Sequence, residues 1–63
     1  MRVDFWLRTP GNHHLYASRS LEVIPRVGEM VCFNPDEKVH EVHSVMHITR
    51  TPQDHEIRVY LNP

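Results

Sequence analysis

Cysteine and glycine are scarce in this chain, which contains one cysteine and two glycines. Because Cys32 is alone, no intramolecular disulfide can form, and zinc sites built on two or four thiolates are excluded. Neither sign of charge is in excess, since seven Lys and Arg face eight Asp and Glu for a net charge of −1. Tight general binding of nucleic acid usually needs a basic excess, so this composition disfavours it.

Long apolar runs are also missing. The N-terminal run at residues 3–7 is interrupted by Asp4, and it is too short for a secretory core or a membrane span. We therefore expect a cytoplasmic protein that makes no contact with a membrane. A lone cysteine agrees with such a reducing compartment.

What the chain does have is an apolar content of 40%, which suits a globular fold. Its 63 residues predict a single domain spanning 1–63. A chain of this length buries only about 60% of the surface that it exposes when unfolded. Such domains are marginal and often rely on a staple or a partner, so the absence of a disulfide favours self-association.

Two segments, 2–8 and 55–61, alternate apolar and polar side chains with the period of two that is typical of half-buried strands. The apolar positions are Val3, Phe5, Leu7, Ile57, Val59 and Leu61. Residues that favour turns, chiefly Pro, Gly, Asn and Asp, predict turns between the strands. These turns are expected at 9–12, 25–29, 34–37 and 50–54.

The middle of the chain is less regular. Residues 13–17 fit a strand that returns from the first turn, 18–20 a polar loop, and 21–24 a short extended piece. A short helix across 14–22 is the alternative. A short apolar strand is expected at 30–33.

The segment 38–49 has apolar residues whose spacing matches neither a helix nor a regular strand. Its content of Val, Ile and Thr favours a strand, and the spacing then requires a bulge near His43 and Ser44. The pattern as a whole predicts an all-β fold, a small barrel of about five short antiparallel strands.

The turn Pro25-Arg26-Val27-Gly28-Glu29, the short apolar strand after it, a Val-x-x-Val-x-His strand at 39–47 and the Arg-Val-Tyr-Leu strand ending at Leu61 carry a resemblance. Together they resemble a group of small uncharacterised proteins of bacteria, their prophages and plasmids, and they are similar to SH3-like barrels. The resemblance covers about 40 C-terminal residues. It implies an SH3-like barrel and a phage or prophage origin, and it brings no catalytic residues.

Six histidines stand out in so short a chain. A helix over 40–47 would align three imidazoles that could seat Zn²⁺ or Ni²⁺. On a strand, His43 and His47 would lie about 13 Å apart, and a cross-strand pair such as His47 with His55 would be needed instead. The metal candidates are therefore His40, His43, His47 and His55. The favoured interpretation is half-exposed histidines without metal, and a pH-sensing cluster is a third reading.

Trp6 lies on the face of its strand opposite the apolar one. If the first and last strands are neighbours, Trp6, Arg8, Arg58 and Tyr60 share one outer face. Such residues stack on bases or peptides and dominate protein interfaces. The alternative is a second small core in which segment 13–24 covers Trp6.

Catalysis is not expected. Cys32 lies in the apolar segment 30–33, where a thiol is buried and inert. The acidic residues at 36–37 and 54–56 read as solvated turns, and no phosphate-binding loop or nucleophile elbow is present.

These observations predict a non-enzymatic module without a cofactor. Its partner is expected to be a protein or a second copy of the chain, bound through Trp6, Arg8, Arg58 and Tyr60. A nucleic-acid-binding barrel and a histidine-rich metal-binding protein are the alternatives.

Overall fold

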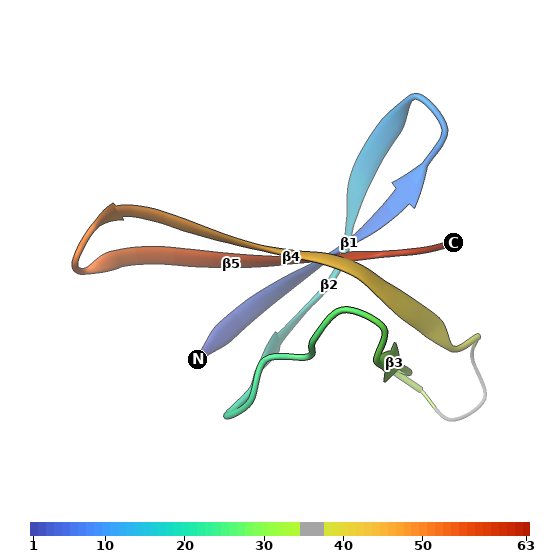
Figure 1. Cartoon of the computed structure of the whole chain (residues 1–63), viewed down its shortest axis with the longest axis horizontal. Helices are drawn as coiled ribbons and strands as arrows, with labels where there is room; N and C mark the ends of the chain where they lie inside the picture. Colours follow the sequence, from blue (N-terminus) through green and yellow to red (C-terminus); the bar gives the residue numbers. More distant parts are fainter. Residues whose placement is uncertain (35–37) are drawn as a thin grey trace.

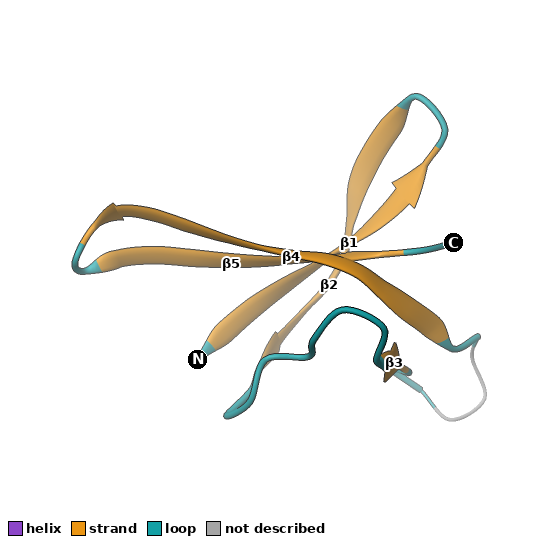
Figure 2. Ribbon diagram, viewed as in Figure 1, coloured by secondary structure: helices purple, strands orange, loops and turns teal. Residues whose placement is uncertain are grey.

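A computed structural model describes residues 1–34 and 38–63 of the chain. Within these ranges every regular element is a strand (Figure 2), which confirms the all-β prediction. The strands are β1 (Arg2–Thr9), β2 (Asn12–Ser20), β3 (Met30–Val31), β4 (His40–Thr51) and β5 (Asp54–Leu61).

The strands form one sheet in the order β2-β1-β5-β4-β3. Three of the four pairings are antiparallel, but β1 and β5 run parallel, with Phe5 opposite Val59. The prediction of purely antiparallel, short strands was wrong in this respect, and β4 has twelve residues. The alternation of apolar and polar residues shows which side chains are buried, but it does not show whether two strands run parallel. That depends on the path of the chain between β1 and β5.

The sheet curls into a half-barrel whose two edges are β2 and β3 (Figure 1). Its extents are 37 × 29 × 18 Å, so the molecule is flattened. The β4–β5 hairpin reaches out on one side of the molecule and the β1–β2 hairpin on another. A small barrel-like fold is therefore present, but no pairing between β2 and β3 closes it within the described residues.

The core lies on the inner face of the half-barrel. Its members are the alternating apolar residues expected for β1 and β5 except Leu7, which is only partly buried and packs against the core, together with one valine of β4: Val3, Phe5, Val42, Ile57, Val59 and Leu61. Leu21, Ile24 and Phe33 pack against this core from outside the strands, and the Phe33 ring meets Phe5 edge-on at 4.8 Å between centroids. The connecting segments thus cover the inner face.

Segment 13–24 differs from expectation at both ends. β2 continues through Ser20, so residues 18–20 are strand and not loop, whereas 21–24 is irregular and the alternative helix is absent. Pairing explains the difference, because Asp4 lies opposite Ser18 and Arg2 opposite Ser20. A strand that is hydrogen-bonded to a neighbouring strand can have polar residues on the face of the sheet that is exposed to solvent.

The turn at 25–29 forms as predicted and fastens the connecting segment to β4. Gly28 has a φ of 89°, a conformation that favours glycine. Its amide donates to the carbonyl of Val42 at 3.0 Å, and the Val42 amide donates to Glu29 at 2.8 Å. The strand that follows covers only two of the residues expected at 30–33. The predicted turn at 34–37 lies mostly outside the described residues.

The predicted bulge in β4 is confirmed. Val42 pairs with Leu61 and Ser44 with Tyr60, so His43 is the extra residue. The bulge lets Val42 and Val45 both face the inner side although they are three positions apart in the sequence. The turn expected at 50–54 is tighter than predicted, because β4 runs to Thr51 and β5 starts at Asp54.

Candidate functional site

The parallel pairing of β1 with β5 brings the four predicted contact residues onto one face of the sheet. Trp6 lies directly opposite Tyr60, and Asp4 lies opposite Arg58. Since Phe5 and Val59 between them point into the core, these residues point to the outer side. Arg8 follows Trp6 on the same face, next to Asn62.

The aromatic rings of the outer face are in contact with cations or other rings. The guanidinium of Arg58 sits 5.1 Å from the centre of the Trp6 ring, within range of a cation–π interaction. The His13 ring lies 5.4 Å from the Tyr60 ring. The Trp6 indole nitrogen is covered and has no hydrogen-bond acceptor among the described residues. An unpaired buried donor is costly, so this nitrogen is a local cost to the fold.

Arg58 and Arg8, two arginines of this face, have different hydrogen-bond partners. Arg58 Nε lies 2.8 Å from a carboxylate oxygen of Glu56, so its charge is matched within the sheet. Arg8 donates to the neutral side-chain oxygen of Asn62 at 3.0 Å, and no carboxylate of the described residues pairs with it. Arg8 is thus the cation of this face that is available to an external carboxylate.

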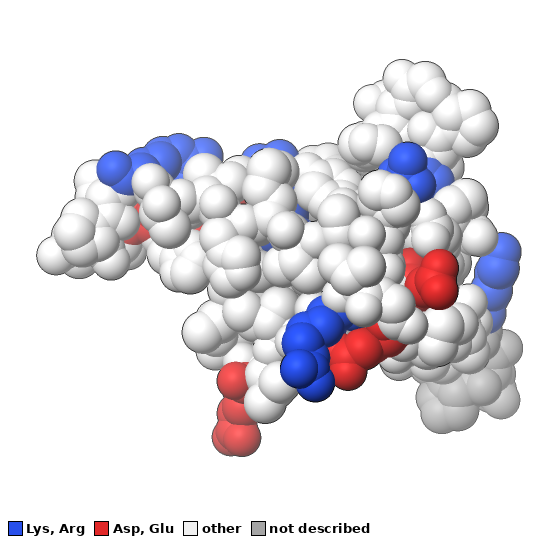
Figure 3. Space-filling view, in the orientation of Figure 1, with Lys and Arg blue, Asp and Glu red and all other residues white. Residues whose placement is uncertain are grey.

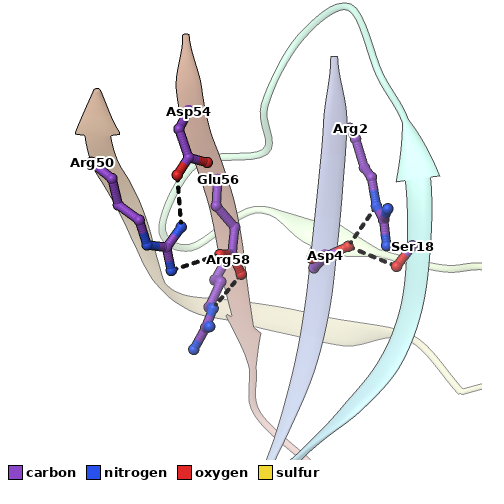
Figure 4. A network of polar contacts seen from close by, with 7 residues as sticks. All are labelled: Arg2, Asp4, Ser18, Arg50, Asp54, Glu56 and Arg58. Carbon is purple, nitrogen blue, oxygen red and sulfur yellow. Dashed lines mark hydrogen bonds and ion pairs between the residues drawn. The ribbon is translucent and has the colours of Figure 1, made fainter. Parts of the chain in front are cut away.

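Polar side chains form two groups of contacts along the strands of this face (Figure 4). Glu56 also lies 3.5 Å from Arg50, and Asp4 accepts a 2.7 Å hydrogen bond from Ser18 and one from Arg2. The hydrogen bond from Arg58 is the main cause that lowers the pKa of Glu56, and the same bond raises the pKa of Arg58. These contacts link β4 with β5 and β1 with β2 on the outer face.

Two exposed apolar side chains extend the face, and the sequence reasoning missed both. Leu15 lies opposite Trp6 on β2 and is 51% exposed, and Met46 lies opposite Arg58 on β4 and is 39% exposed. The signal that could have found Leu15 was its register with Trp6, which required knowing that β2 pairs with β1.

The structure does not support the alternative in which segment 13–24 covers Trp6 in a second small core. β2 lies beside β1 in the sheet, and Leu21 and Ile24 pack against the core on the inner side. No described backbone segment crosses the outer face above Trp6, which remains partly exposed.

The four histidines named as metal candidates are separated. His40 is buried, and its Nδ1 lies 2.9 Å from the Asn62 carbonyl, while His43 contacts Ser44. Only His47 and His55 come together, with Nδ1 and Nε2 2.9 Å apart. In residues 1–34 and 38–63, no group of three or more His, Cys, Asp or Glu side chains could hold a metal ion.

Two further expectations need correction. Cys32 is exposed and not buried, because β3 ends at Val31 and the chain leaves the sheet; its thiol lies 2.8 Å from the Asn34 carbonyl. Residues 54–56 are the start of β5 and not a turn, so the side chains of Asp54 and Glu56 are fixed against Arg50.

A cavity opens on the inner side, between the segment at 21–25 and the chain at 29–33. Its volume is ≈ 530 Å³, and apolar side chains such as Leu21, Ile24 and Met30 line it, with Arg19 and Glu29 among its few charged residues. The sequence reasoning did not predict this hollow, because it depends on how an irregular segment folds back over the sheet.

No protein-family model, curated protein or solved structure matches this chain. Among the described residues, no helix has the length and apolar character needed to cross a bilayer.

Proposed function

We propose that this protein is a non-enzymatic binding module that engages a protein partner through its outer face. The observation that carries the proposal is the arrangement of Trp6 opposite Tyr60, with Arg58 against the indole ring. Trp, Tyr and Arg are the residue types most enriched at the centres of protein interfaces. Their position on a hydrogen-bonded sheet limits the conformational entropy lost on binding.

The charges near this face favour a protein over a nucleic acid. Glu56 already neutralises Arg58, and Asp4 lies opposite it on β1. On the side of the molecule drawn in Figure 3, Lys and Arg lie interspersed with Asp and Glu. A surface that follows a phosphate backbone instead needs several unpaired cations along one path.

The chemistry of the face also defines the partner. Arg8 offers a guanidinium that no carboxylate of the described residues neutralises, while Leu15, Met46 and the Trp6 ring offer apolar surface on the same face. The complementary surface carries a carboxylate next to aromatic or aliphatic side chains. We therefore propose an acidic, apolar segment of another protein as the ligand, and a second copy of the chain is an alternative that the test separates.

The first experiment measures whether the face is free in solution. Light scattering behind size exclusion, at about pH 7.5, is expected to give a monomer. A dimer that Leu15→Glu separates into monomers would assign the face to self-association and overturn the proposal of a different partner.

The second experiment supplies candidate ligands directly. A displayed library of random peptides is selected on the wild-type protein and depleted on the Leu15→Glu variant. Recovered peptides are expected to combine Asp or Glu with apolar side chains and to lose at least about tenfold in affinity on Arg8→Ala, as when an interface cation is removed.

Val27→Glu is the matched control, since Val27 is also an exposed apolar residue but lies in the turn after Pro25. It should leave peptide binding unchanged, and the circular dichroism of all variants must match the wild type. Peptides equally sensitive to Val27→Glu, or no enriched peptides at all, would refute the assignment of this face. Salt-sensitive binding of a labelled single-stranded oligonucleotide that Arg8→Ala weakens would instead support the nucleic-acid alternative.

A further inference from the structure

A second feature of the molecule lies in the part of the β4–β5 hairpin that reaches away from the body (Figure 1), on the side of the sheet opposite the proposed binding face. His47 pairs with Ile57 and His55 with Thr49, so the two histidines are diagonal neighbours on one side of the hairpin. The twist of a two-stranded ribbon shortens one diagonal, which brings such side chains together.

The two imidazoles meet through their nitrogen atoms. His47 Nδ1 and His55 Nε2 are 2.9 Å apart, and the ring centroids are 5.1 Å apart with planes inclined by 30°. Both side chains are exposed, so a dissolved cation reaches them without any movement of the core. At this separation the two nitrogens share a single proton, or a metal ion takes the place of that proton.

The separation of the two nitrogens indicates which geometry suits them. With metal–nitrogen bonds of about 2.0–2.1 Å, two ligands 2.9 Å apart subtend about 90° at the metal. A tetrahedral zinc site requires about 3.3 Å between ligands with the same bond lengths. An angle of about 90° belongs to square-planar or tetragonal sites, which Cu²⁺ and Ni²⁺ prefer, and Cu²⁺ also binds most tightly in the divalent series.

We propose that His47 and His55 form a two-point binding site for Cu²⁺ at the end of the β4–β5 hairpin. Each imidazole supplies one neutral nitrogen: the ring that donates the shared proton changes tautomer, so that its proton moves to its far nitrogen, and the accepting ring already carries its proton there. The neighbouring carboxylates of Asp54 and Glu56 are engaged by Arg50, and no third protein ligand stands ready in the described residues. Water therefore completes the coordination, which leaves positions open to a ligand from another molecule.

The test is a calorimetric titration of the full chain with Cu²⁺ at about pH 7.5, where an ordinary imidazole is neutral. We expect one ion per chain with a Kd below about 100 μM. His47→Gln and His55→Gln should each weaken binding at least about tenfold, because even residues that only orient a metal ligand change affinity by about that factor. Zn²⁺ should bind more weakly than Cu²⁺.

His43→Gln is the matched control, since His43 is also exposed and on β4, but its ring nitrogen Nδ1 lies 3.1 Å from the Ser44 hydroxyl and not against a second histidine. His13→Gln with His14→Gln tests the other histidine pair, on β2. Electron paramagnetic resonance of the Cu²⁺ complex should show two nitrogen ligands in the wild type and fewer in His55→Gln. Binding that survives the double variant His47→Gln, His55→Gln, that depends on His13 and His14, or that is absent below about 100 μM would overturn the proposal.

Discussion

The two faces of the sheet use the same strands for different purposes. On the inner face, Phe5, Val59 and Leu61 are fully buried and belong to one cluster of core residues. On the outer face, Trp6 and Tyr60 occupy the adjacent positions but remain partly exposed, among polar side chains linked by hydrogen bonds. The comparison teaches that residues one position apart along a strand can belong either to the buried core or to an accessible face, which is the face proposed to bind a partner.

The largest test of this division is Phe5→Ala on the inner face. Phe5 is 1% exposed and packs edge-on against Phe33, so its removal leaves a cavity in a core of six fully buried residues. The expected loss is about 3–5 kcal/mol of unfolding free energy, enough to unfold a marginal domain. Urea denaturation followed by circular dichroism measures it. Leu15→Ala, an exposed apolar residue, is the control and should change stability by less than about 0.5 kcal/mol.

A smaller loss is expected at the polar end of the inner face. His40 is 6% exposed, its Nδ1 donates to the Asn62 carbonyl at 2.9 Å, and its ring meets that of Tyr16. His40→Phe keeps the ring packing and removes the donor, so the expected loss of unfolding free energy is about 0.5–1.5 kcal/mol. His43→Phe, at an exposed position, provides the comparison by thermal denaturation. Equal melting temperatures for His40→Phe and wild type would mean that the bond does not stabilise the fold.

On the outer face, stability should depend on single hydrogen bonds and not on packing. Ser18 donates to Asp4 at 2.7 Å across β1 and β2. Ser18→Ala should lower the unfolding free energy by about 0.5–1.5 kcal/mol. Ser20→Ala is a matched control in the same strand, because no hydrogen bond of the Ser20 side chain is present in the described residues. If both variants lose equally, strand propensity and not the bond to Asp4 explains the result.

The inner face could be predicted from the sequence, and the outer face only in part. Alternation identified Ile57, Val59 and Leu61 as buried, and the irregular spacing of the valines identified the bulge at His43, because both patterns record burial directly. Strand direction and strand register, in contrast, produce no pattern of apolar residues in the sequence. The parallel pairing that sets Trp6 opposite Tyr60, and the pairing that sets Leu15 beside Trp6, depend on contacts between distant segments.

Contacts between distant segments also explain what the sequence could not predict about the histidines and Cys32. The need for a cross-strand partner for His47 followed from strand geometry, but its contact with His55 depended on where the hairpin turns. Cys32 was misjudged because an apolar run was read as a strand, whereas β3 stops at Val31 once its pairing with β4 ends. Local patterns therefore predict burial well only where a neighbouring strand is present to bury them.

The smallest expected effect concerns the ion pair between Glu56 and Arg58 on the outer face. The pKa of Glu56 is lowered from its ordinary value of 4.5, chiefly by the hydrogen bond from Arg58. A lowered pKa in the folded state means that the stabilisation is complete above pH 4.5 and is lost as the pH falls through the lowered pKa. Glu56→Gln should therefore melt below the wild type at neutral pH and together with it in strong acid.

Thermal melts of wild type and Glu56→Gln across this range measure the difference. Glu22→Gln, which changes a carboxylate that has no ion pair in the described residues, should follow the wild type throughout. Salt at about 1 M should shrink the neutral-pH difference, since the Debye length is then about 3 Å and the pair is partly exposed. A difference that persists unchanged in acid would show that Glu56 acts through packing, and the outer face would then resemble the inner one more than its exposure suggests.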